Sequence, residues 1–321
     1  MTVRDRVAKS VDQEVLFSIA ADVASVVLSS SVEPRPIRAG VSSMNYVVSD
    51  SSGEYVVRLD LFRDESEVRR DFQILKACRN FILNGPGDAL WVGTQKGIAA
   101  SFRPFVAGAT LSDEDIKDSA TIRKCGRQLA ILHRTPIPAS LRREWFYKEP
   151  LANFRELRTS DNHLVRQARK LLERAAVKLR DASWEASLVH SDFKSDNLLL
   201  GAGQVSVLDW EKAAWAPRLF DVSLALFHAS TTPFAIPEET VESFISGYSE
   251  NEYRNPDFMR QLALMSHVAA AIYFLVDAEI FEIESAKSHL SEIEKRHAKY
   301  FIEYCVPRYE KFIELAYFAV L

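Results

Sequence analysis

The chain has 321 residues, of which 47% are hydrophobic and 26% charged, a composition typical of a globular protein that buries one large core or two moderate ones. A net charge of −4 and a pI near 6.0 argue against a general nucleic-acid binder, which needs a basic surface to neutralise phosphates. The three cysteines are odd in number and in no metal-ligand spacing, so neither a disulfide framework nor a zinc site is expected.

The first third of the chain predicts a small antiparallel sheet and two helices. An apolar-periodic helix near the N-terminus precedes the strands. A second amphipathic helix is expected between Asp64 and Asn80, where Val68, Phe72 and Leu75 recur at helical spacing. The five expected strands lie around Pro36–Arg38, Met44–Ser49, Glu54–Leu59, Leu90–Val92 and Ile98–Val106.

The remaining two thirds of the chain are mostly helical. Ser112 is a predicted N-cap with Asp115 at the third position, and one helix is expected to run on to about His133. Two short β-like runs, Ser187–His190 and Val205–Leu208, interrupt the helices. The order indicates an α+β fold with a boundary between residues 1–105 and 106–321.

The apolar stretch Leu262–Val276 is shorter than the roughly 20 residues that a bilayer-spanning helix needs. The first residues lack a clean secretory core and cleavage site. We therefore expect a cytoplasmic protein with no membrane or nucleic-acid partner, as a monomer or a homodimer.

One motif carries chemical information. Residues Leu188–Leu200 read LVHSDFKSDNLLL, and residues Val205–Glu211 read VSVLDWE. This resembles the H-x-D-x-x-x-x-N and apolar-apolar-D loops of the aminoglycoside phosphotransferase and choline kinase family, and through them the catalytic and metal-binding loops of protein kinases. The resemblance implies a protein-kinase-like two-lobe fold, with a nucleotide-binding lobe over residues 1–105 and a catalytic and substrate-binding lobe over 106–321.

The resemblance also implies roles for five residues of the motif. Phosphoryl transfer needs one carboxylate near the attacking hydroxyl and hard oxygen ligands for Mg²⁺. Asp192 is expected to accept or orient the hydroxyl proton, and His190 to brace the loop. The amide oxygen of Asn197 and the carboxylate of Asp209 are the expected metal ligands, with Glu211 assisting the metal.

Further matches lie in the first lobe. Gly40, Ser42 and Ser43 belong to a turn between two strands where backbone N–H groups would cover phosphates, although an ordinary hairpin has the same signature. Arg58 occupies the strand position of the phosphate-pairing lysine of protein kinases. Its acidic partner on the next helix is expected to be Asp71, with Glu67 as the rival.

The resemblance places the lobe connector at Ser101–Gly108, where backbone groups near Arg103, Phe105 and Val106 would read the base of the nucleotide. Lys194, within the catalytic loop, is expected to contact the γ-phosphate or to be solvated. Asp221 matches a family residue that anchors the catalytic loop, and His133 is expected to be a core histidine.

The implied reaction is ATP- and Mg²⁺-dependent phosphorylation of a hydroxyl group. Only 11 residues separate Asp209 from Asp221, too few for a peptide platform, so the acceptor is expected to be a small molecule. From Ser230 onward there are 8 Lys and Arg against 15 Asp and Glu, a net of −7, which favours a cationic acceptor but is equally typical of solvated helices. A non-catalytic nucleotide-binding module and an atypical protein kinase are the alternatives.

Overall fold

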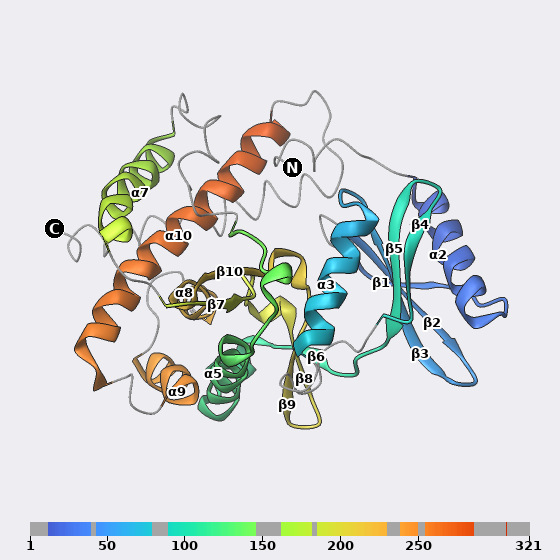
Figure 1. Cartoon of the computed structure of the whole chain (residues 1–321), viewed down its shortest axis with the longest axis horizontal. Coiled ribbons are helices and arrows are strands. Elements are labelled where there is room, and N and C mark those ends of the chain that lie inside the picture. Colours follow the sequence, from blue (N-terminus) through green and yellow to red (C-terminus); the bar gives the residue numbers. More distant parts are fainter. Residues whose placement is uncertain are drawn as a thin grey trace. The chain divides into compact units, whose positions relative to one another are not determined.

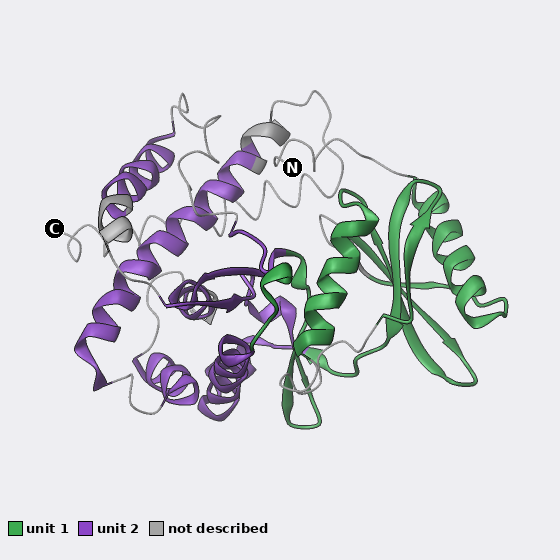
Figure 2. Cartoon of the chain, viewed as in Figure 1, with its two compact units in different colours: residues 1–109, 136–141, 199–211 green, residues 110–135, 142–198, 212–321 purple. Residues whose placement is uncertain are grey.

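The computed structural model describes residues 12–39, 43–78, 89–145, 162–181, 185–229, 238–249, 254–285 and 306. The chain divides into two units (Figure 2). Unit 1 comprises residues 1–109, 136–141 and 199–211, and unit 2 comprises residues 110–135, 142–198 and 212–321. The division separates Leu198 from Leu199, so Asp192 and Asn197 belong to unit 2, whereas Asp209 and Glu211 belong to unit 1.

A five-stranded antiparallel sheet forms the centre of unit 1 (Figure 1). Its strands, in the order β1-β2-β3-β5-β4, include all five that the sequence predicts. At the turn between β2 and β3, the carboxylate of Asp50 accepts hydrogen bonds from the backbone N–H groups of Ser52 and Gly53. The bounds are β1 (Arg35–Ala39), β2 (Ser43–Asp50), β3 (Gly53–Asp60), β4 (Trp91–Gln95) and β5 (Ile98–Pro104).

Helices α2 (Gln13–Leu28) and α3 (Glu65–Cys78) cover opposite faces of this sheet (Figure 1). The core beneath α2 includes Leu59 and Phe102, whereas Val68 of α3 packs with Ala99. Successive strand residues point to opposite faces, and directly paired residues share a face. The face on the α3 side therefore carries Val56, Arg58 and Asp60 of β3, paired with Arg103, Ser101 and Ala99 of β5.

A hairpin of β8 (Leu198–Gly201) and β9 (Gln204–Val207) brings the Asp209 segment to unit 1, where the turn η5 (Trp210–Lys212) follows it. The hairpin approaches the connector that follows β5. A Cβ atom on Gly201 would lie 2.5 Å from the carbonyl oxygen of Ala107, and one on Gly108 would lie 3.0 Å from that of Leu200. Gly108 also has a φ of +151°, so glycine is required here for both space and conformation.

Unit 2 consists of helices around a two-stranded sheet. Helix α10 packs on α7 and α8, while α5 packs on α9. The helices are α4 (Asp113–Lys117), α5 (Ser119–Arg134), α7 (His163–Asp181), α8 (Arg218–Ala229), α9 (Glu238–Tyr248) and α10 (Pro256–Ser285), and the sheet is β7 (Ala186–Val189) with β10 (Ala214–Pro217). Of the short elements, η4 (Ser195–Asn197) belongs to unit 2, η1 (Ala139–Leu141) belongs to unit 1, and β6 (Ala109–Thr110) spans the boundary between the units.

The single helix expected from Ser112 to His133 is wrong, because the structure has two helices there. Ser112 and Asp115 form the capping box of the short α4, in which each side chain accepts the other residue's backbone N–H. Asp118 then has an extended conformation, with ψ of 111°, and its carboxylate caps the start of α5 by accepting the N–H of Thr121. A second N-cap inside an apolar-periodic run therefore divides the helix.

Helix α10 is long and apolar enough over Pro256–Glu279 to span a bilayer by composition alone. Of its most apolar window, however, 67% is buried inside the protein. Burial of this extent is what a core helix of a soluble protein also shows, so the composition of α10 is weak evidence for a membrane span.

Two glycines allow α5 and α9 to pack with their backbones in close contact. A Cβ atom on Gly126 of α5 would lie 2.1 Å from the carbonyl oxygen of Phe244, and one on Gly247 of α9 would lie 2.1 Å from that of Arg123. The obstructing atoms are backbone, which cannot move aside without separating the helices.

We predict that Gly126→Ala lowers the free energy of unfolding by about 1–3 kcal/mol, because it forces α5 and α9 apart. Urea denaturation followed by circular dichroism measures the effect. Arg127→Ala, on the exposed side of the same helix, is the control and should change stability little. Equal stability of Gly126→Ala and the wild type would contradict the packing described.

Candidate functional site

The loop after β7 carries Asp192, and the buried carboxylate of Asp221 holds its backbone. Asp221, in the first turn of α8, accepts the N–H of His190 at 2.5 Å and that of Ser191 at 2.7 Å. Ser191 has a φ of +63°, a conformation that costs a non-glycine residue energy and persists only where surrounding bonds impose it. Asp221 therefore anchors this loop, as the sequence predicts.

His133 contributes to the same anchor. Its two ring nitrogens lie 3.3 Å from Oδ2 of Asp221 and 2.8 Å from the hydroxyl of Tyr248. His133 thus belongs to the supporting structure. The ring of His190 is buried and meets Phe193 edge-on, with 6.2 Å between the ring centroids, which agrees with a bracing position within the loop.

The carboxylate of Asp192 is buried but surrounded by donors from four residues of unit 2. Oδ1 accepts the hydroxyl of Tyr273 at 2.6 Å and lies 3.4 Å from Nζ of Lys194. Oδ2 accepts Nδ2 of Asn197 at 3.1 Å and lies 3.4 Å from Nζ of Lys212. Burial by itself raises the pKa of Asp192, but Lys212, Lys194 and Tyr273 outweigh it and hold the pKa well below its usual range.

The contacts of Asn197 settle which of its atoms is available to a ligand. Its amide nitrogen donates to the backbone oxygen of Asp192 at 2.9 Å as well as to the carboxylate. Because one end of the planar amide is used in this way, the opposite end presents the amide oxygen. An amide oxygen is a hard ligand of the kind that Mg²⁺ prefers.

We predict that Asp192→Asn unfolds at lower urea concentration than the wild type at pH 7, and that this difference narrows as the pH falls below about 4. The folded-state pKa is depressed, so the stabilisation is present above the unfolded-state pKa and is lost as the pH falls through the folded value. The urea midpoints of the wild type and of Asp192→Asn, taken at several pH values from 7 to 3, measure this difference. A difference that stays constant across this range would contradict the assigned charge.

In unit 1, one guanidinium holds both carboxylates of the second predicted loop. Arg58 donates from Nη1 to Asp209 at 2.7 Å and from Nη2 to Glu211 at 3.0 Å. Burial lowers the pKa of Arg58, but Asp209, Asp60 and Glu211 together raise it well above its ordinary value. Asp209 itself has a φ of +60°. Carboxylate oxygens are hard ligands of the kind that Mg²⁺ prefers, so the chemistry of Asp209 and Glu211 fits that ion.

The predicted pairing of Arg58 with Asp71 is wrong, and so is the rival pairing with Glu67. Asp71 is bound by Nη1 of Arg63 at 2.5 Å, and Arg63 also donates from Nη2 to Asp60 at 2.9 Å. Glu67 instead accepts the N–H of Asp64 at the start of α3. The short side chain of Asp71 is the physical reason, because Arg63, just before α3, reaches it and Arg58 does not.

Burial raises the pKa of Asp71 to about 6, against the opposing effect of Arg63. The ion pair therefore keeps a poorly solvated carboxylate charged at neutral pH. It also ties α3 to the end of β3, since Arg63 contacts Asp60 and Asp71 together.

We predict that Arg63→Met lowers the free energy of unfolding by about 3–5 kcal/mol, because it leaves the buried Asp71 without its cation. Arg260→Met is the matched control, since Arg260 pairs with Asp257 at an exposed site, with 78% and 76% of the side chains accessible, and should change stability little. Urea denaturation of both variants measures the difference. Equal effects of the two changes would contradict a buried anchor.

The remaining predicted residues are placed only in part. Gly40 and Ser42 lie outside the described residues, and Ser43 is buried at the start of β2. In the connector, the N–H of Phe105 donates to the carbonyl of Glu54 at 2.9 Å, so that group is already used. The connector contact expected at Phe105 and Val106 remains a prediction for the other backbone groups.

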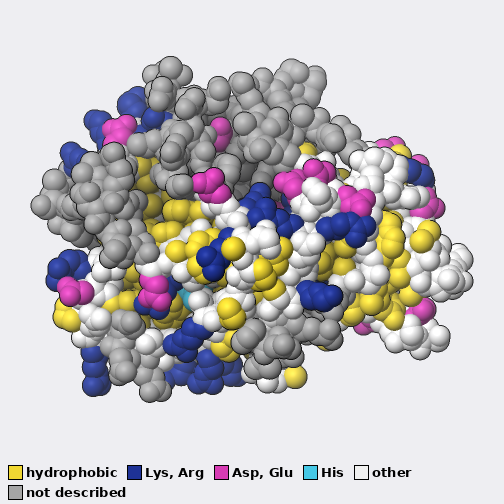
Figure 3. Space-filling view, in the orientation of Figure 1, with side chains coloured by type: hydrophobic (Ala, Val, Ile, Leu, Met, Phe, Trp, Pro, Cys, Tyr) yellow, Lys and Arg dark blue, Asp and Glu magenta, His cyan; other side chains and the backbone are white. Residues whose placement is uncertain are grey.

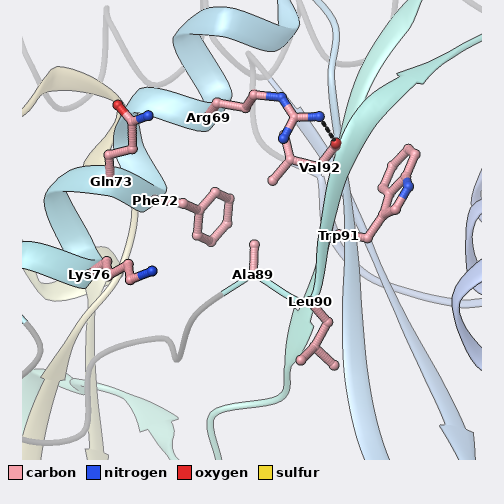
Figure 4. Close-up of a pocket in the computed structure, with 8 residues that line it drawn as sticks. All are labelled: Arg69, Phe72, Gln73, Lys76, Ala89, Leu90, Trp91 and Val92. Atoms are coloured by element: carbon pink, nitrogen blue, oxygen red, sulfur yellow. Dashed lines mark hydrogen bonds between the residues drawn. The ribbon is translucent and has the colours of Figure 1, made fainter.

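A groove of about 590 Å³ lies between α3 and β4 (Figure 4). The close-up shows Phe72 directed toward Ala89 across the groove, and Arg69 donating to the carbonyl of Val92. Among the described residues, none of the predicted site residues and no carboxylate lines it. Size alone therefore does not make it the chemical site. Its lining is Arg69, Phe72, Gln73, Lys76, Ala89, Leu90, Trp91 and Val92.

Four residues of the two clusters are missing from the sequence prediction: Tyr273, Lys212, Arg63 and Asp60. Tyr273 lies 81 residues from Asp192 in an apolar helix, so no local spacing indicates it. Lys212 directly follows Glu211, and Arg63 lies three residues after Asp60. A search for basic residues beside the predicted carboxylates could have found Lys212, whereas Asp60 and Arg63 carry no such signal.

A model of the phosphotransferase enzyme family matches residues 33–262 of the chain. No protein of curated function matches it in sequence.

Solved structures share the fold at low sequence identity. A spectinomycin phosphotransferase in complex with ADP and spectinomycin is 15% identical, with a TM-score of 0.69 over 98% of this chain and 100% of that one. A choline/ethanolamine kinase family protein from Mesorhizobium loti is 13% identical, with a TM-score of 0.66 over 94% and 98%. A choline kinase from Streptococcus pneumoniae is 14% identical, with a TM-score of 0.63 over 91% and 99%. The predicted protein-kinase-like α+β fold is confirmed.

Proposed function

The chain belongs to the phosphotransferase enzyme family, and on this basis we propose that it transfers the γ-phosphoryl group of ATP, bound with Mg²⁺, to a hydroxyl group of a small molecule. The observation that carries the proposal is the state of Asp192, a buried carboxylate kept ionised by two lysines, with the amide of Asn197 turned toward it. Solved relatives that contain ADP or AMP-PNP support a nucleotide as the donor.

Asp192 would act on the acceptor by orientation. A carboxylate with so low a pKa is a weak base, so it accepts a hydrogen bond from the attacking hydroxyl and takes the proton late, when the bond to phosphorus is advanced. Tyr273 and Asn197 fix the direction of its two oxygens. Holding the hydroxyl in line with phosphorus supplies much of the rate enhancement of such enzymes.

In unit 1, Asp209 and Glu211 would hold the metal ion that accompanies the nucleotide; in unit 2, the amide oxygen of Asn197 is the ligand that the motif implies. The metal supplies neutralisation of the phosphate charge. Within unit 1, Arg58 pairs with both carboxylates and so compensates their charge. The planar guanidinium of Arg58 also has the donor geometry that suits phosphate oxygens.

The chain between the two loops supports a small acceptor. After Asp209 it enters η5, then β10 from Ala214 to Pro217, and α8 begins at Arg218. The structure describes every residue between Asp209 and α8, and these residues form only η5 and the short strand β10. A peptide platform of the kind that protein kinases use has no room there, so the atypical protein kinase is the weaker alternative.

The acidic residues of α10 support a cationic acceptor, whereas those of α9 do not. Helix α10 carries Asp277 one turn after Tyr273 and on the same side, near the residue that contacts Asp192. The acids of α9, Glu238, Glu239 and Glu242, are exposed. Basic side chains gather over α5 (Figure 3), so the surface of unit 2 is not uniformly acidic. The proposal therefore extends to a cationic acceptor, such as an aminoglycoside or an amino alcohol, bound on the side of α10 that carries Tyr273.

Cys78 and Cys125 are buried free thiols, and burial raises the pKa of each to about 12. Thiols in this state are unreactive and fit a reducing compartment. A cytoplasmic location is consistent with them and belongs to the proposal.

The proposed reaction is tested by an ADP-release screen over aminoglycosides, amino alcohols, homoserine and sugars, with Mg-ATP as the donor. Acceptor-dependent ADP release and a phosphorylated acceptor detected by mass spectrometry would support it. Tight binding of Mg-ATP without product from any acceptor class would favour a non-catalytic nucleotide-binding module.

We predict that Asp192→Ala lowers kcat by at least about 10³-fold and leaves the affinity for Mg-ATP largely unchanged, whereas Asp209→Ala weakens the binding of Mg-ATP as well. Stopped assays on the acceptor from the screen and calorimetric titration with Mg-ATP separate the two effects. Arg260→Met is the control. Full turnover by either aspartate variant would refute its assigned role.

A further inference from the structure

Arg103 differs from the other arginines on the same face of the unit 1 sheet. Arg103 of β5 is paired with Val56 of β3, and its neighbour Ser101 is paired with Arg58. The side chains of Arg58, Ser101 and Arg103 therefore share the face on the α3 side. A diagonal neighbour on adjacent strands lies roughly 5–8 Å away, within reach of an arginine side chain.

The charges on this face are not evenly compensated. Arg58 contacts Asp209, Glu211 and Asp60, and Arg63 contacts Asp60 and Asp71. Among the residues that the structure describes, Arg103 contacts no carboxylate, and its buried Nε has no hydrogen-bond partner. Burial, followed by repulsion from Arg58, lowers the pKa of Arg103 to about 10, so it still carries its charge at neutral pH.

Ser101, two residues before Arg103 on the same face of β5, also has a polar atom without a hydrogen-bond partner. It is 0% exposed, and the atom without a partner is its Oγ. A buried donor without a hydrogen-bond partner costs stability, and both Nε of Arg103 and Oγ of Ser101 are such donors. Two such groups at adjacent positions of one sheet face indicate a surface that is completed by a ligand.

The charged groups near Arg103 define the chemistry of that ligand. Those close enough to act on its charge include Arg58, Asp209 and Asp60, which belong to the ion-pair cluster that the proposed function assigns to the metal and phosphates. A positive charge with no counter-ion is best satisfied by an anion. A guanidinium binds phosphate through two parallel hydrogen bonds, which a neutral base cannot match in strength.

We propose that Arg103, together with Ser101, binds the phosphate chain of the donor nucleotide, in addition to any backbone contact of the connector with the base. The inference rests on the proposed function, because it requires a nucleotide in this site. It assigns Arg103 a binding role that its position beside the connector alone does not indicate. Arg58 and Arg103 would then contact the phosphates from two adjacent strands.

The test is calorimetric titration of the ligand-free protein with adenosine, AMP, ADP and ATP, with no acceptor present. Arg103→Met removes the charge and keeps an unbranched stem. We expect it to leave adenosine binding unchanged and to weaken ADP and ATP binding by about 10- to 100-fold. Arg103→Lys keeps the positive charge but not the two parallel donors of the guanidinium, so its affinity for ADP and ATP should fall by a smaller factor. Arg260→Met, at an exposed ion pair, is the control and should bind all four as the wild type does.

Thermal unfolding of the ligand-free variants separates a binding role from a structural one. Because Arg103 contacts no carboxylate among the described residues, Arg103→Met should melt at the wild-type temperature or above it. A lower melting temperature would overturn the proposal in favour of a structural arginine. If Arg103→Met loses affinity for adenosine and for ATP by the same factor, the proposal is overturned in favour of base recognition. If it binds every nucleotide as tightly as the wild type does, the proposal is overturned outright. If the wild type binds none of the four, the proposed function itself fails.

Discussion

The ion pair of Arg58 with Asp209 and Glu211 is the interaction on which the unit 1 site depends. Two carboxylates near each other in a partly buried place repel, and they can both stay ionised only beside a cation. Arg58 provides that cation, and its own burial is offset by the same acids. Both carboxylates thus contact the same cation, and their oxygens are of the kind that the proposed divalent metal ion prefers.

The same physical requirement is met differently in unit 2. Asp192 is surrounded by Lys194, Lys212, Tyr273 and Asn197, so its charge is retained despite burial. These donors lower its basicity while they fix its direction. The result suits a carboxylate that aligns a hydroxyl more than one that removes its proton early, and it agrees with a reaction in which the protein contributes position and charge.

A division of roles among arginines follows from the short side chain of Asp71. Arg63 anchors α3 through Asp71 and Asp60, whereas Arg58 pairs with Asp209 and Glu211, the proposed metal ligands. Arg103, which has no acid among the described residues, is the third member of this basic group. Arg63 therefore stabilises the unit, Arg58 compensates the carboxylates, and Arg103 is assigned to the ligand.

The sequence by itself determined the five strands, the first-lobe helices and the motif that carries Asp192, Asn197 and Asp209, because these depend on spacing within a few residues. The capping box at Ser112 was predictable for the same reason, although the second cap at Asp118 was not recognised. The tertiary structure alone decided that Tyr273 contacts Asp192 and that Asp71 pairs with Arg63. Such partners are chosen by side-chain reach and by the need to compensate buried charge, and neither leaves a periodic signal in the chain.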